Sequence, residues 1–381
     1  MESFNPNRVQ KALFRLLQLG LNNSEPGAID SLFRDITKSE WENCYRLAVG
    51  QGVKCIAWDG VLKLPKEVHP PLSLKLKWAL SVEKYEGVYR RYCIAAHQLG
   101  NFFKENGIAM VQFKGVGLSP YYPVPQHREG GDIDIYICPD SNCDNLKASD
   151  YADELIRQSG IKIGRHSYKH TNFVYNGVPI ENHKYFVNVE EYKYGGQVDE
   201  ILKSSLAPCC CALLDGELTV NTPSLAFNSL YIPFHAFQHY GCGLALHHLC
   251  DWACIIAQGG LETIPEEVTD RKFLLGIAAF TFLSNEILGS RIGMWSSDGG
   301  VGASLCNGRM KGIERESVER LAKRMLQEML EPRYSNRIPA KGRLYALIYK
   351  WRRLVHRYNL SGDIFEYSLL KKIRRFVTPL E

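Results

Sequence analysis

The chain has 381 residues, of which 45% are hydrophobic and 23% charged. This composition is typical of globular proteins and excludes a mainly disordered chain or a low-complexity array. A chain of this length is expected to form two or three structural units. Its formal net charge of +5 is small, but the basic residues are unevenly distributed.

The start of the chain and its apolar runs predict a cytoplasmic location. The first residues lack the basic start, apolar run and cleavage site of a signal peptide. The longest apolar run, residues 273–283, is shorter than the ~20 residues that span a bilayer, so we expect a buried helix and no transmembrane segment. We expect the twelve cysteines to be reduced, with Cys209, Cys210 and Cys211 packing as small apolar residues.

Residues 1–107 form the first predicted region, which is helical. Leucines between positions 13 and 19 recur at helical spacing, and a longer amphipathic pattern runs from residue 78 to residue 103. A proline-rich stretch at 64–71 separates the early helices from the long one.

Residues 108–205 form the second region, a small α/β core. Its elements are predicted from apolar runs, strict alternation or helical spacing. They are a strand at 108–113, a short helix opening at 114–117, a strand at 132–138, a helix at 148–158, and strands at 170–175 and 178–184. The last two strands flank Asn176-Gly177, which is a strong signal for a tight β-hairpin.

Residues 206–381 form the third region, where helical spacing returns. The predicted helices cover 224–240, 246–258, 271–288 and 313–330. The fold class is therefore α+β, with a small sheet-containing core between two helical regions.

The third region ends in a basic segment. Between residues 341 and 375 the sequence has ten Lys or Arg and only two acidic residues. We favour a solvated helix face whose Tyr, Leu and Trp residues pack inward. The alternative is a patch for nucleic acid, a phosphorylated acceptor or acidic lipid.

Two aspartates in the strand at 132–138 are the strongest candidates for a functional site. Side chains two apart on a strand share a face, so Asp132 and Asp134 lie together while the alternating isoleucines face the core. Neighbouring carboxylates repel each other unless a cation lies between them. Oxygen ligands of this kind favour Mg²⁺ or Mn²⁺, particularly with substrate phosphates in the shell. Taken alone, Asp-x-Asp is also compatible with two solvated aspartates at a strand edge.

The residues that precede this pair favour a phosphate site. Gly130 and Gly131 have no side chains where the strand begins, which lets a ligand approach the backbone. Lys114 and Gly115 join a strand to a helix, where free N–H groups and a lysine can hold an anion. Arg128 can neutralise a phosphate as well.

The predicted hairpin supplies a third carboxylate. Glu181 and His183 share a strand face, opposite Ile180. A two-metal site needs a third acidic ligand, so we predict catalytic and metal-binding roles for Asp132, Asp134 and Glu181.

The stretch from residue 113 to residue 137, FKGVGLSPYYPVPQHREGGDIDIYI, resembles nucleotidyltransferases of the DNA polymerase beta type. It is more closely similar to a bacterial family of uncharacterised nucleotidyltransferases with a Lys-Gly start, an Arg and a Gly-Asp-Ile-Asp motif. The resemblance implies a mixed sheet with helices, and two Mg²⁺ ions held by Asp132, Asp134 and Glu181. In the phosphate turn the superfamily usually has Gly-Ser or Gly-Gly, whereas this chain has Lys114-Gly115. The similarity extends to residue 183 and is weaker over 235–254.

Residues 235–254 are rich in histidine and cysteine. Pairs four residues apart share a helix face, and these pairs are His235 and His239, His247 and Asp251, and Cys250 and Cys254. A zinc site is one interpretation. Hydrogen-bonded structural histidines are the favoured one, because apolar residues dominate the surrounding helices. If this segment borders the cleft, we expect His239, His247 and Asp251 to contact nucleotide or acceptor there. His183 of the predicted hairpin is a further candidate cleft residue.

We therefore predict a metal-dependent nucleotidyltransferase that moves a nucleoside monophosphate from an NTP to an unknown acceptor. That acceptor can be a small molecule, a sugar, a protein or a nucleic acid. The predicted nucleotide-binding residues are Lys114, Gly115, Arg128 and Gly131. Two alternatives stay open, which are a catalytically inactive nucleotide-binding module and an interaction scaffold that binds nucleic acid or membrane through the basic C-terminal segment.

Overall fold

The computed structural model describes residues 5–24, 31–138, 145–164, 167–207, 209–295, 300–302, 305–334 and 342–367. Contacts divide the chain into two units. The sheet unit comprises Pro6–Phe186 and Ser204–Ser224, and the helical unit comprises Met1–Asn5, Val187–Lys203 and Leu225–Glu381. Neither unit is continuous in sequence, whereas the three predicted regions follow one another along the chain. The borders of the predicted regions stay a prediction.

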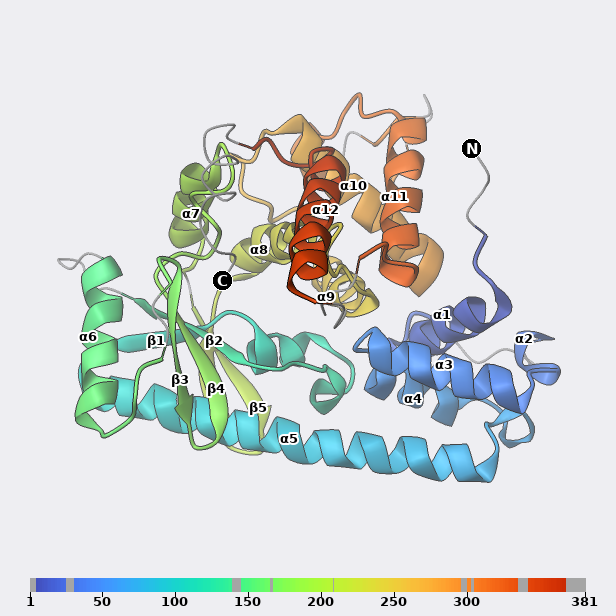
Figure 1. Cartoon of the computed structure of the whole chain (residues 1–381), viewed down its shortest axis with the longest axis horizontal. Helices are drawn as coiled ribbons and strands as arrows, with labels where there is room; N and C mark the ends of the chain where they lie inside the picture. Colours follow the sequence, from blue (N-terminus) through green and yellow to red (C-terminus); the bar gives the residue numbers. More distant parts are fainter. Residues whose placement is uncertain are drawn as a thin grey trace. The chain divides into compact units, whose positions relative to one another are not determined.

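A four-stranded sheet forms the centre of the sheet unit (Figure 1). In spatial order the strands are β1 (Ala109–Gln112), β2 (Ile133–Cys138), β4 (Val178–His183) and β3 (His170–Tyr175). Strand β2 pairs antiparallel with β1 and parallel with β4, and β3 pairs antiparallel with β4. The sheet is therefore mixed, and the predicted α+β class is confirmed.

The predicted β-hairpin is confirmed as β3 and β4. Asn176 and Gly177 connect the strands with φ angles of 49° and 76°, the positive values that a two-residue hairpin turn requires. This turn fixes the register, so His170 lies opposite His183 and Asn172 lies opposite Glu181.

One face of the sheet is covered by two helices. The isoleucines of β2, together with Phe173 and Ile180, pack in one core with α5 (Leu72–Glu105) and α6 (Asn145–Gln158). Because side chains alternate along a strand, the polar residues of β2 and β4 emerge on the opposite face. The burial of the isoleucines thus determines which face carries the carboxylates.

Helix α5 connects the sheet to the N-terminal helices of the same unit, as Figure 1 shows. It is longer than the predicted helix over 78–103. The N-terminal helices are α1 (Arg8–Gly20), α2 (Ser31–Arg34), α3 (Lys38–Gly50) and α4 (Lys54–Lys63). Short 3₁₀ turns cover Lys66–Val68, Gly115–Tyr121 and Pro125–His127. The predicted short helix after Lys114 is the second of these turns.

A second hairpin in the sheet unit, β5 (Cys210–Asp215) and β6 (Leu218–Thr222), was not predicted. The dipeptide Asp215-Gly216 is a hairpin signal that would have located its turn. Cys209, Cys210 and Cys211 are exposed, so the expectation that they pack as small apolar residues is wrong.

The helical unit contains the predicted C-terminal helices. Its helices are α7 (Gly195–Ser204), α8 (Leu225–Gln238), α9 (Leu246–Ile256), α10 (Arg271–Leu283), α11 (Arg315–Leu330) and α12 (Arg343–Ser361). A π-helical turn, Ser284–Leu288, continues α10, and a 3₁₀ turn covers Leu305–Gly308. Across the described ranges, no helix combines the length and the apolar character that crossing a membrane requires.

Helix α12 carries part of the basic C-terminal segment. Leu344, Leu347 and Trp351 are 72%, 65% and 50% exposed, so the expectation that the apolar residues of this segment pack inward is wrong for them. Leu354 is buried and does pack inward. The basic residues at 341 and at 371–375 lie outside the described residues.

Candidate functional site

Three carboxylates meet on the face of the sheet opposite the core that α5 and α6 cover. Asp134 of β2 lies directly opposite Glu181 in the parallel pairing with β4, and Asp132 immediately precedes β2. One oxygen from each carboxylate lies within 4.8 Å of the others. Asp134 is 1% exposed, while Asp132 and Glu181 are partly exposed. The structure thus brings together the three residues that the sequence predicted as metal ligands.

Lys114 forms ion pairs with both aspartates. Its Nζ lies 3.3 Å from Asp134 Oδ2 and 3.9 Å from Asp132 Oδ1. Asp134 Oδ2 is buried and makes no hydrogen bond. The most buried oxygen of the cluster therefore depends on electrostatic neutralisation by a nearby cation.

The two aspartates differ in their affinity for protons. Burial alone would raise the pKa of Asp134, but the charge of Lys114 and a hydrogen bond from His183 outweigh burial and hold that pKa well below its usual value. Burial and the neighbouring charge of Asp134 raise the pKa of Asp132, against the opposing effect of Lys114. Asp134 is thus the firmly ionised member of the pair, and Asp132 accepts a proton more readily.

His183 connects the two strands. Its Nε2 lies 3.0 Å from Asp134 Oδ1 and 3.2 Å from Glu181 Oε2, while its Nδ1 lies 3.2 Å from the carbonyl oxygen of Tyr185. The ring thus faces the two carboxylates with one nitrogen and a backbone carbonyl with the other. The hydrogen bond from His183 also lowers the pKa of Glu181 despite partial burial. His183 therefore links the carboxylates of the two strands through one ring nitrogen.

His170 is a site residue that the sequence analysis missed. It lies opposite His183 on β3, and its Nδ1 is 3.7 Å from Glu181 Oε2. This Nδ1 is buried and makes no hydrogen bond. Burial and the nearby His183 lower the pKa of His170, which favours its neutral form. Counting the strand register outward from the Asn176-Gly177 turn would have placed His170 opposite His183.

The predicted phosphate turn is packed closely against the strand that carries the aspartates. Gly115 has a φ of +61°, and a Cβ at this position would lie 2.6 Å from the carbonyl oxygen of Asp132. The guanidinium of Arg128 is buried and donates to the carbonyl oxygen of Gly115 at 2.8 Å. Arg128 thus stabilises the turn, and the phosphate contacts predicted for Lys114, Gly115 and Arg128 stay predictions.

Helices α4 and α5 hold the segment that leads into Asp132. The Tyr85 hydroxyl accepts a hydrogen bond from the Gly130 amide at 2.6 Å, and the Tyr92 hydroxyl donates to the Gly131 carbonyl at 2.9 Å. Glu129 forms an ion pair with Lys54 of α4. Helices α4 and α5 therefore position the start of β2.

His127 also links the segment before Asp132 to helices α4 and α5. Its Nδ1 lies 2.8 Å from Asp59 of α4, and its Nε2 lies 2.9 Å from Glu86 of α5. Burial works against protonation, but these two carboxylates outweigh it and raise the pKa of His127. The resulting charged bridge ties two helices to the segment before Asp132.

A hollow of about 720 Å³ lies beside the carboxylates. Gly131, Asp132 and Glu181 form one part of its lining, and Lys162 and Asn172 contribute further polar groups. Its size is within the range of small-molecule sites in proteins. The sheet unit therefore offers space for a ligand next to the proposed metal ligands.

The predicted cleft residues belong to two different units. His239, His247 and Asp251 belong to the helical unit, whereas His183 lies within the carboxylate cluster of the sheet unit. Contacts of His239, His247 and Asp251 with nucleotide or acceptor stay predictions.

The sequence model of a protein family described as an uncharacterised nucleotidyltransferase matches residues 37–288, which is more than half of the chain. This range includes β1 to β6 and continues through α10. No curated protein and no solved structure matches the chain.

We predict that Gly115→Ala lowers the free energy of unfolding by about 1–3 kcal/mol, because a residue with a side chain is strained at this positive φ and its Cβ overlaps the Asp132 carbonyl. Gly131→Ala is the matched control, since a Cβ at Gly131 has no atom within 4 Å. Urea denaturation of both variants measures the difference. Equal stabilities would show that the close approach of the turn to the strand is not required.

We predict that neutralising the two aspartates changes stability in opposite directions in chelator-treated protein at neutral pH. The raised pKa of Asp132 means that its charge destabilises the fold, so Asp132→Asn should stabilise the protein. We expect less than about 1 kcal/mol, because the Asp132 side chain is 36% exposed and solvent screens its charge. Asp134→Asn should destabilise by about 1–3 kcal/mol, because Lys114 and His183 lose their buried partner.

The pH dependence of the Asp134 effect follows from its lowered pKa. The stability that its charge contributes is present above the unfolded-state pKa of about 4 and is lost as the pH falls through the folded-state pKa. Thermal melts between neutral and acidic pH measure this. A loss of stability in both variants at neutral pH would contradict the assigned charge balance.

Proposed function

Because the chain belongs to the uncharacterised nucleotidyltransferase family, we propose that it transfers a nucleoside monophosphate from an NTP to an acceptor at Asp132, Asp134 and Glu181. The acceptor in this proposal is a hydroxyl or phosphate group. The observation that carries the proposal is the convergence of three carboxylates within 4.8 Å, from two adjacent parallel strands.

The residues present fit a hard divalent cation. All three groups offer carboxylate oxygens, the donor type that Mg²⁺ and Mn²⁺ prefer. Asp134 Oδ2 is buried without a hydrogen bond and is neutralised by Lys114 Nζ at 3.3 Å, so this oxygen already lies where a cation is favoured. Mg²⁺ or Mn²⁺ held by Asp132, Asp134 and Glu181 would neutralise charge on the transferring phosphate and on the leaving pyrophosphate.

The surrounding residues of the chain have separate roles in this proposal. His183 orients Asp134 and Glu181 through its Nε2, which contacts both. Lys114 compensates the aspartates and, with its side chain 24% exposed, contacts the triphosphate. The hollow beside Asp132 and Glu181 receives part of the substrate. Phosphoryl-group transfer depends mainly on such positioned charge, so no covalent intermediate with the protein is required.

We predict that Asp132→Asn lowers the rate of nucleotidyl transfer by about 10²–10³-fold, the typical loss when one electrostatic contact to a transition state is removed. The assay supplies each α-labelled NTP with Mg²⁺ and a mixed extract of metabolites and RNA, and follows label transfer and pyrophosphate release. Asp150→Asn is the matched control, because Asp150 is an exposed aspartate of α6 in the same unit.

Binding measurements made beside this assay separate the alternatives. Saturable NTP binding without any product would favour the inactive nucleotide-binding module. Full activity of Asp132→Asn would exclude the carboxylate cluster as the catalytic site. Salt-sensitive binding to nucleic acid or lipid that ignores Asp132 would favour the scaffold hypothesis.

A further inference from the structure

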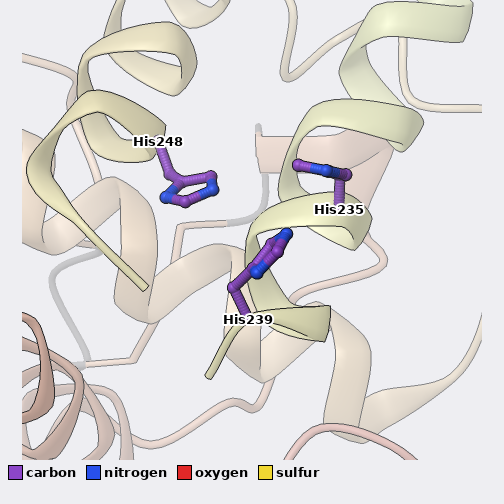
Figure 2. A group of neighbouring side chains, drawn as sticks. All are labelled: His235, His239 and His248. Atoms are coloured by element: carbon purple, nitrogen blue, oxygen red, sulfur yellow. The ribbon is translucent and has the colours of Figure 1, made fainter. Parts of the chain in front are cut away.

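Three histidines of the helical unit point into one space (Figure 2). His235 and His239 lie one turn apart near the end of α8, and His248 lies in the first turn of α9. The ring centroids are 4.8 Å apart for His235 and His239, 5.7 Å for His235 and His248, and 5.1 Å for His239 and His248. One ring nitrogen from each lies within 4.8 Å of the others.

The surroundings of this histidine cluster (His235, His239 and His248) favour neutral rings. The two helices that carry it are rich in buried apolar residues. His248 is itself buried, and His235 and His239 are partly exposed. Three cationic rings at this spacing would repel one another, whereas neutral imidazole nitrogens are good ligands for transition metals.

We propose that His235, His239 and His248 form a binding site for one transition-metal ion of the Zn²⁺ type. Three imidazole nitrogens without a carboxylate favour Zn²⁺ and its neighbours in the first transition series over Mg²⁺ or Ca²⁺. Because two of the rings are partly exposed, the fourth position of a tetrahedral ion is left for water or an exogenous ligand.

His248 couples this site to the start of α9. Its Nδ1 accepts a hydrogen bond from the Ala245 amide at 3.1 Å, so the neutral ring carries its proton on Nε2. In Figure 2 this Nε2 is the nitrogen directed toward the other two rings. Metal ligation through Nε2 requires the ring proton to move to Nδ1. The protonated Nδ1 can no longer accept the hydrogen bond from the Ala245 amide, so that bond is lost. Metal binding therefore changes the ring tautomer and the cap of α9 together.

The proposal is independent of the nucleotidyl-transfer site. The histidine cluster lies in the helical unit and the carboxylates lie in the sheet unit, and the two donor sets prefer different metals. A Zn²⁺-type ion at the histidines therefore requires no ion at Asp132, Asp134 and Glu181.

The test uses the full chain without a histidine tag. Purified protein is stripped with chelator and titrated with Co²⁺, whose visible spectrum reports tetrahedral coordination, and then with Zn²⁺ in competition. We expect one tetrahedrally coordinated ion per chain, distinct from any ion that the carboxylates bind. His239→Gln and His248→Gln should each weaken binding by at least the roughly 10–100-fold that losing an outer-shell partner costs.

Two control variants and one spectroscopic measurement accompany the titration. His356→Gln removes a histidine of the same unit that pairs with Glu328, and Asp132→Asn/Asp134→Asn removes the carboxylate site; both should retain full Co²⁺ binding. In wild-type protein with ¹⁵N-labelled histidine, Zn²⁺ should convert His248 from the Nε2–H to the Nδ1–H tautomer. This readout does not depend on the folding of any variant.

Absence of stoichiometric Co²⁺ and Zn²⁺ binding by folded wild-type protein would overturn the proposal. Binding that is unchanged in His239→Gln and His248→Gln would also overturn it. An unaltered His248 tautomer under saturating Zn²⁺ would assign the three rings a purely structural role. If wild-type protein binds Co²⁺ at the histidines but shows no nucleotidyl transfer, the metal-site proposal stands. That result would count against the proposed function alone.

Discussion

The repulsion among Asp132, Asp134 and Glu181 is the constraint around which the sheet unit is organised. Three carboxylates with oxygens within 4.8 Å are stable in a fold only beside compensating positive charge. Lys114 provides this charge from the turn after β1, and His183 contacts two of the carboxylates from the end of β4. Both residues contact Asp134, which is the most buried carboxylate of the cluster.

This charge balance also explains the role of the N-terminal helices. The turn that carries Lys114 touches the backbone of Asp132 through Gly115, so small shifts of either segment would change the distance between the charges. Helices α4 and α5 restrain the segment before Asp132 through Tyr85 and the charged bridge of His127. The helices that precede the sheet therefore contribute to the geometry of the site without supplying a ligand.

Local periodicity in the sequence was sufficient for much of this arrangement. Alternation predicted the face of Asp134, and Asn176-Gly177 predicted the hairpin that carries Glu181. The contact of His183 with Asp134 was not predictable from local patterns, because it depends on the parallel register of β2 and β4. These strands are neighbours in the sheet, but α6 and β3 lie between them in the sequence. The buried role of Arg128 depends on a tertiary contact with Gly115, which no spacing pattern encodes.

Calorimetric titration with ATP, GTP, CTP and UTP, each with and without Mg²⁺, tests most directly whether the carboxylates bind metal and nucleotide together. The account predicts Mg²⁺-dependent binding of at least one NTP to wild-type protein, and its loss in folded Asp132→Asn/Asp134→Asn protein. Mg²⁺-independent binding, or binding that persists in the double variant, would contradict it.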